Sequence, residues 1–174
     1  MPHKAVEIAN AFLALPAASA GLTQMQLQKL AYFAHGWNWA INGEPLIQDG
    51  FEAWTFGPVV RDLYDHTKLF GSAPIQRLIT PDDSHVARFF GGNGKAPPYR
   101  ADLTERENQV LEQVLSSYGG LSAGRLSEMT HQPDTPWSKA FKLGQNTPIG
   151  EDEVRAYFDA LADRAAEAMA DHAA

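Results

Sequence analysis

Apolar residues recur at helical spacing over most of the chain, and this pattern predicts a mainly helical domain. Near the N-terminus, Ile8, Phe12 and Leu15 are four and three positions apart, which places them on one face of a short helix. The strongest pattern runs from about residue 24 to 41, and Thr23 is a suitable N-cap for it. Because apolar residues occupy most sides of this helix, we expect it to lie at the centre of the domain.

A change of pattern after the central helix predicts a small β-hairpin over about residues 45–56. Asp49-Gly50 is a turn signal, and the flanking segments Pro45–Ile47 and Phe51–Phe56 are rich in strand-forming residues. Pro58 then suits the first position of a helix, where its missing N–H would have no partner. We therefore expect a helix to begin at Pro58.

The segment from about residue 71 to 98 is predicted to be a long loop. It contains eight Gly or Pro residues, and only residues 75–79 resemble a strand. Loops of this length are uncommon inside compact domains. We expect this one to be either mobile or an arm that contacts a partner.

Helical signals return in the last third of the chain. Thr104 and Glu107 form a capping box, Ser122 can cap a short helix, and Pro136 can open another. A final helix is predicted over about residues 151–171. The fold class is therefore mainly α, a multi-helix domain around a central apolar helix with one small hairpin.

Composition and charge narrow the classes of function. The 174 residues suit a single domain over 1–174, and the absence of cysteine excludes thiol chemistry, disulfides and iron–sulfur clusters. A net charge of −7 makes duplex DNA a poor partner. The last helix carries much of this charge. Its acidic residues either form a solvated face or attract a basic protein partner. With no long apolar run and no signal-peptide pattern, we expect a cytoplasmic protein without membrane contact.

No catalytic or metal-binding constellation stands out. Gly120-Leu121-Ser122-Ala123-Gly124 matches the nucleophile-elbow pattern, but a helix rather than a strand is predicted before it, so Ser122 is better interpreted as an N-cap. The histidines lack metal-ligand spacing, and His131 has no evident orienting partner. We expect no cofactor, no metal, no small-molecule substrate and no enzymatic activity. A small hydrolase that uses Ser122 or His131 remains the alternative, as does a self-associating structural protein of phage origin.

The aromatic residues suggest protein binding. Aromatics at helical spacing usually lie in a core, which is our expectation for Trp37, Trp54 and Phe56. Trp39 falls on the opposite flank of its helix from Leu27 and is our candidate for an exposed interface residue.

Four motifs together resemble the Panacea domain of SocA-type antitoxins, to which GepA-like phage-associated proteins are related. The motifs are Leu27-x-Lys29-Leu30-x-Tyr32-Phe33-x-His35-Gly36, Phe51-x-Ala53-Trp54-x-Phe56-Gly57-Pro58-Val59, Leu121-Ser122 and Thr130-His131-x-x-x-x-Pro136-Trp137-x-x-Ala140. The similarity extends from about residue 6 to 141. Each motif is weak alone, but the set is fairly specific.

This resemblance implies an antitoxin that neutralises a cognate, SocB-like toxin by direct binding. In the SocA branch the antitoxin acts as a proteolytic adaptor, which presents to the ClpXP protease a toxin that blocks DNA replication. Direct nucleic-acid binding is not expected, because the chain has no room for an added DNA-binding domain. The residues that we expect to bind a partner are Trp39, Trp54, Arg61, Tyr64, His131 and Trp137, and the 71–98 loop is a further candidate.

Overall fold

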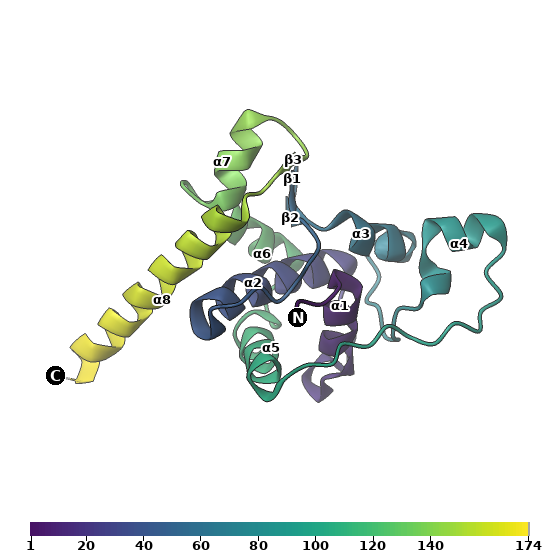
Figure 1. The fold of residues 1–174 in the computed structure, drawn as a ribbon, viewed down its shortest axis with the longest axis horizontal. Coiled ribbons are helices and arrows are strands. Elements are labelled where there is room, and N and C mark those ends of the chain that lie inside the picture. Colours follow the sequence, from purple (N-terminus) through teal and green to yellow (C-terminus); the bar gives the residue numbers. More distant parts are fainter. Residues whose placement is uncertain (174) are drawn as a thin grey trace.

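The computed structural model describes residues 1–173 and shows a mainly helical fold with one small antiparallel sheet, as predicted (Figure 1). In chain order the elements are α1 (Ala5–Ala14), η1 (Pro16–Ala18), α2 (Gln24–Asn42), β1 (Glu52–Trp54), β2 (Gly57–Val59), α3 (Arg61–Thr67), η2 (Lys68–Phe70), η3 (Pro81–Asp83), α4 (His85–Phe90), α5 (Glu105–Tyr118), α6 (Ala123–Thr130), α7 (Pro136–Leu143), β3 (Thr147–Pro148) and α8 (Glu151–Ala173).

Helix α2 is the centre of the domain, which confirms the prediction from its apolar pattern. Its N-cap Thr23 accepts a hydrogen bond from the Gln26 N–H, and Gly43 ends the helix in the left-handed conformation. Helices α1, α5, α6 and α8 all pack on it. The ring of Phe158 from α8 meets Tyr32 and Phe33 edge to face. Helix α2 therefore runs through a hydrophobic core that contains a cluster of aromatic rings.

The hairpin forms later in the chain than predicted. Strands β1 and β2 pair antiparallel across a turn at Thr55 and Phe56, and β3 completes a sheet with the order β2-β1-β3. The expected strand Pro45–Ile47 lies outside it: the His3 N–H donates to the Leu46 carbonyl at 2.8 Å. Since Leu46 and Ile47 are buried, pairing with the N-terminal segment satisfies the backbone there.

Pro58 does not begin a helix, contrary to the expectation. It pairs with Ala53 inside β2, and α3 begins only at Arg61. Strand β2 is an edge strand, where proline is tolerated because no ladder hydrogen bond is required on its outer side. The preference of proline for the first position of a helix was therefore misleading at Pro58, because proline also suits the edge strands of sheets.

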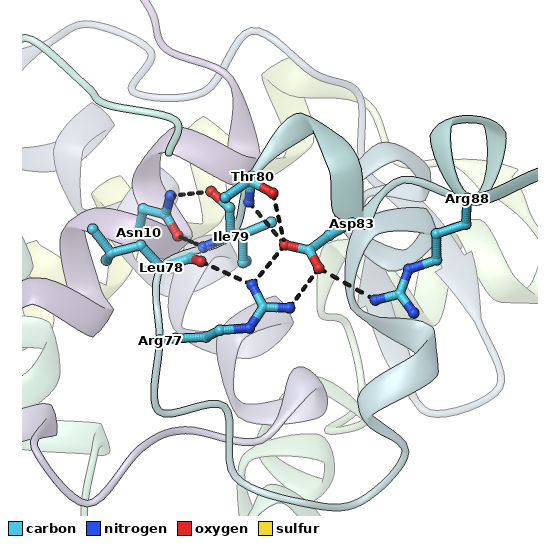
Figure 2. A network of polar contacts seen from close by, with 7 residues as sticks. All are labelled: Asn10, Arg77, Leu78, Ile79, Thr80, Asp83 and Arg88. Carbon is cyan, nitrogen blue, oxygen red and sulfur yellow. Dashed lines mark hydrogen bonds and ion pairs between the residues drawn. The ribbon is translucent and has the colours of Figure 1, made fainter. Parts of the chain in front are cut away.

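The 71–98 segment is more ordered than a plain loop, because it contains η3 and α4. Instead of a strand over 75–79, Ile75 makes a single bridge to Leu22. Figure 2 shows how Asp83 organises the segment: its carboxylate accepts from Arg77 at 2.8 and 2.5 Å and from Arg88 at 3.2 Å. Burial raises the pKa of Asp83, but hydrogen bonds from Arg77 and Thr80 outweigh this and hold it at about 2.

Two elements project from the core at opposite ends of the molecule (Figure 1). At one end, α4 exposes Phe89 and Phe90. At the other, α8 is buried only at Val154 and Phe158 and then continues outward. Its first turn is attached to α2, since the His35 ring hydrogen bonds to the Glu151 carboxylate. Within residues 1–173, no helix is both long and apolar enough to cross a membrane.

Candidate partner-binding site

The turn between β1 and β2 is fixed by side chains from α6 and α7. Each of its carbonyl groups at residues 54, 55 and 56 contacts a different donor. The Trp137 indole N–H donates to the Trp54 carbonyl at 2.8 Å, and the Ser127 hydroxyl donates to the Phe56 carbonyl at 2.8 Å. Between them, Nε2 of His131 lies 3.0 Å from the carbonyl oxygen of residue 55. The turn is thus held in one position before any partner binds.

Helix α2 fixes the strand that follows this turn. The Gln28 amide both donates to the Val60 carbonyl and accepts from the Val60 N–H, at 3.1 and 2.9 Å. Next to it, the Lys29 ammonium donates to the Pro58 carbonyl at 2.9 Å. Lys29 is only 1% exposed, and burial lowers its pKa from 10.5 to about 7. A titratable amine therefore lies inside the protein directly beneath the hairpin.

Gly57 is required for this close packing. Its φ of +108° is unfavourable for residues with a side chain. In addition, a Cβ atom at this position would lie 2.6 Å from the Thr130 hydroxyl oxygen and 2.7 Å from the Lys29 Cε. The glycine of the Phe-Gly-Pro-Val motif therefore permits α2, α6 and β2 to meet.

An open groove lies on the outer side of the hairpin, with a volume of about 410 Å³. Half of its lining residues are apolar or aromatic. The lining consists of Gln24, Met25, Gln28, Lys29, Trp54, Thr55, Phe56, Val59, Tyr64 and Gln145. Phe56 is 64% exposed at the rim, although it was predicted to be a core residue. Its position at the tip of a two-residue turn explains the difference, because side chains there project away from the sheet.

Aromatic and charged side chains order one wall of the groove. The rings of Trp54 and Tyr64 meet edge to face with centroids 4.9 Å apart. The Arg61 guanidinium lies 5.3 Å from the Trp54 ring and forms an ion pair with Glu52 at 2.7 Å. Interface energetics are often dominated by Trp, Tyr and Arg in ordered surroundings of this type. The arrangement is suited to bind an apolar polypeptide surface.

The structure distributes the predicted site residues over three environments. Trp54 and Tyr64 line the groove with Arg61 beside them. His131 and Trp137 hold the turn from its other side, and the Trp137 side chain is buried. Whether these residues contact a partner stays a prediction.

Trp39 lies in a different environment, where α8 covers it. Its indole N–H donates to Glu151 at 3.3 Å, and the Arg155 guanidinium lies 5.1 Å from its ring. It also lines a separate depression together with Phe51 and Ile149. The other tryptophan of the helix, Trp37, is half-buried against Phe158, in line with its predicted packing role.

The residues of the hydrolase alternative do not form a catalytic arrangement. Ser122 accepts a hydrogen bond from the Arg125 N–H and caps α6, as expected from the sequence. His131 caps the other end of the same helix and directs its ring to backbone carbonyl groups of residues 127 and 55. Among residues 1–173, no group of three His, Asp or Glu side chains could hold a metal ion.

Sequence reasoning missed Lys29 and Gln28 as residues of the site. A signal for them was present, because a helix predicted to be central must bury its polar residues as well. A lysine and a glutamine within the apolar stretch Leu27–Ala34 therefore required buried hydrogen-bond partners.

Comparison with known proteins agrees with the motifs that build this site. The family described as "Antitoxin SocA-like, Panacea domain" matches residues 27–138, which include the hairpin and every residue that supports its turn. Antitoxin SocA of Caulobacter vibrioides (strain NA1000 / CB15N) is 34% identical over 130 residues, which cover 74% of this chain and 64% of that relative. The chain thus spans less than two thirds of the relative's length. No solved structure matches. The chain belongs to the SocA-like antitoxin family with a Panacea domain.

Proposed function

We propose that this protein is an antitoxin that neutralises a cognate toxin by binding it in the groove beside the β1–β2 turn. The observation that carries the proposal is an open groove with aromatic walls, most of whose lining residues lie within the region that matches an antitoxin family. The chain acts as a binding protein in the cytoplasm and not as an enzyme. The bound toxin is then delivered to the ClpXP protease.

The rigidity of the turn supports this role. Each of its three carbonyl groups contacts a side chain of α6, of its C-cap His131 or of α7, so the groove loses little conformational freedom when a partner binds. Phe56 and Tyr64 then provide aromatic contact area at a low entropic cost. Burying one such ring in an interface commonly contributes about 2 kcal/mol or more.

Delivery to a protease requires a second surface, for which α8 is the candidate. Its exposed portion carries Asp163, Glu167 and Asp171. This portion and helix α4 project from opposite ends of the molecule (Figure 1). A basic surface of a partner would be attracted to these charges. Binding in the groove and delivery through α8 are separable, because different residues carry them.

The test of toxin binding uses groove variants of the full chain and, as the candidate toxin, the product of the neighbouring gene. Phe56→Ala and Tyr64→Ala should each raise the Kd by about tenfold or more in calorimetry, because each removes an aromatic contact. Ile41→Ala is the matched control, since Ile41 is 54% exposed at the other end of α2. Full affinity in both groove variants, with an unchanged circular dichroism spectrum, would refute the proposed site.

The adaptor role has its own experiment. Purified ClpXP should degrade the toxin only when the antitoxin is present, and Phe56→Ala should slow this degradation. A variant with Asp163, Glu167 and Asp171 changed to Asn or Gln should bind toxin normally and slow degradation. If toxin is inactivated stoichiometrically without ClpXP, the antitoxin acts by occlusion and delivery is not required.

A further inference from the structure

The floor of the groove holds a buried amine without an acidic partner. Among the ion pairs formed within residues 1–173, none includes Lys29. Its ammonium has three N–H donors, and one of them is used by the Pro58 carbonyl. Because buried donors without acceptors are costly, the ammonium gains from any further acceptor that reaches it.

Two amides that line the groove are already committed to other groups. Gln28 is committed to both backbone groups of Val60. At the far side of the groove, the Gln145 amide donates to the Thr55 hydroxyl at 2.7 Å. The remaining lining is dominated by apolar and aromatic side chains. A ligand that enters the groove therefore meets mostly apolar walls, with the buried Lys29 at their base.

We propose that the groove binds an acidic side chain of the toxin and places its carboxylate against Lys29. This inference rests on the proposed function, in which the groove is the toxin-binding site. The carboxylate supplies acceptors for the ammonium, and such charge-assisted hydrogen bonds are stronger than neutral ones. The methylene groups of the Glu or Asp pack between Met25, Trp54 and Tyr64. The site thus selects an acidic residue within an otherwise apolar segment.

The pairing makes binding depend on pH. The pKa of Lys29 is about 7 because the amine is buried, so the free protein is partly neutral there near neutral pH. A bound carboxylate favours the ammonium and raises this pKa, so binding takes up a proton. Binding therefore weakens as the pH rises above the free-state pKa of about 7. The other titratable groups that face the hairpin are Tyr64 on α3, the Arg61–Glu52 pair beside Trp54, and His131 behind the turn.

The experiment uses a small carboxylate as the probe, so that it does not depend on the toxin. ¹⁵N-labelled full-length protein is titrated at pH 6.5 and 9 with 4-phenylbutyrate and with its neutral analogue 4-phenyl-1-butanol. Chemical shifts of the Trp54 indole N–H and the Phe56 and Val59 amides report binding. We expect the acid to bind about tenfold more tightly than the alcohol at pH 6.5 and this preference to shrink at pH 9.

Two variants assign the preference to one amine. Lys29→Met should bind both probes equally. Lys68→Met, which removes a half-buried cation that pairs with Asp65 and lies 5.9 Å from the Tyr64 ring, should keep the preference. Equal binding of acid and alcohol by the wild type, a preference that survives in Lys29→Met, or a preference unchanged at pH 9 would each overturn the inference. The pH comparison within the wild type remains decisive if Lys29→Met does not fold.

The outcomes also separate this inference from the proposed function. If Phe56→Ala loses toxin binding but the wild type shows no preference for the acid, only the role of Lys29 is refuted and the toxin site stands. An acid preference that requires Lys29, together with toxin binding that is insensitive to Phe56→Ala, would refute the toxin site. Light scattering can also detect self-association. If self-association depends on Lys29, the groove binds a second copy of this chain rather than a toxin, and the inference is overturned.

Discussion

Replacing Lys29 by methionine should stabilise the free protein at low pH. Methionine keeps a flexible, unbranched stem in the same space and removes the ammonium. Lys29 is 1% exposed and has no charged partner, so the folded state bears most of the cost of removing its charge from water. The substitution removes that cost, although the Pro58 carbonyl then loses its donor.

The magnitude follows from the pKa. Burial lowers the pKa of Lys29 from 10.5 to about 7. At about 1.4 kcal/mol per pKa unit, the protonated amine destabilises the folded state by about 3–5 kcal/mol below pH 7. Because the unfolded chain binds the extra proton between pH 7 and 10.5, this penalty fades as the pH rises through that interval. Leaving the Pro58 carbonyl without a donor costs about 1–3 kcal/mol at every pH.

The two contributions give a difference that changes with pH. Lys29→Met should be more stable than the wild type by about 1–3 kcal/mol at pH 6, and the two should become equal near pH 9. Urea unfolding followed by tryptophan fluorescence at pH 6, 7.5 and 9 measures this, with Lys68→Met as the control. A variant that is less stable than the wild type at pH 6, or a difference that does not vary with pH, would refute the reasoning.

Three other substitutions test how the elements are joined. Gly57→Ala should lower the free energy of unfolding by about 2–3 kcal/mol, because of its positive φ and the clash at Lys29, whereas Gly50→Ala, in open space, should change it by less than about 1 kcal/mol. In Gly36→Ala the new Cβ would overlap the Phe158 ring, so α8 should detach and its amides should exchange faster with deuterium. Asp83→Asn should expose residues 81–96 to limited proteolysis; in the wild type the stabilisation from this carboxylate, present above about pH 4, should be lost as the pH falls towards 2.

Helices were predictable from the sequence because their signals are local. Thr23 and Thr104 each lie next to the helix that they cap and form a capping box with the residue three positions on. The strands were misplaced because pairing joins distant segments. Nothing within Pro45–Ile47 indicates that its partner is His3, more than forty residues away in the chain.

The site was predictable in part for the same reason. Trp54 and Tyr64 could be identified as candidates because large aromatics are typical of interfaces. The role of Lys29 depends on a carbonyl at Pro58, which approaches only when β2 folds over α2. Trp39 resembled an exposed contact because the sequence does not show that α8 returns to cover it.

The outward course of α8 has a practical consequence for measurements on this protein. Fifteen residues separate Phe158, the last buried side chain of the helix, from Ala173. At about 1.5 Å per residue, the described end of the helix stands roughly 22 Å beyond the core. A fluorophore or affinity tag attached there should report on rotation of the whole molecule while leaving the hairpin unobstructed.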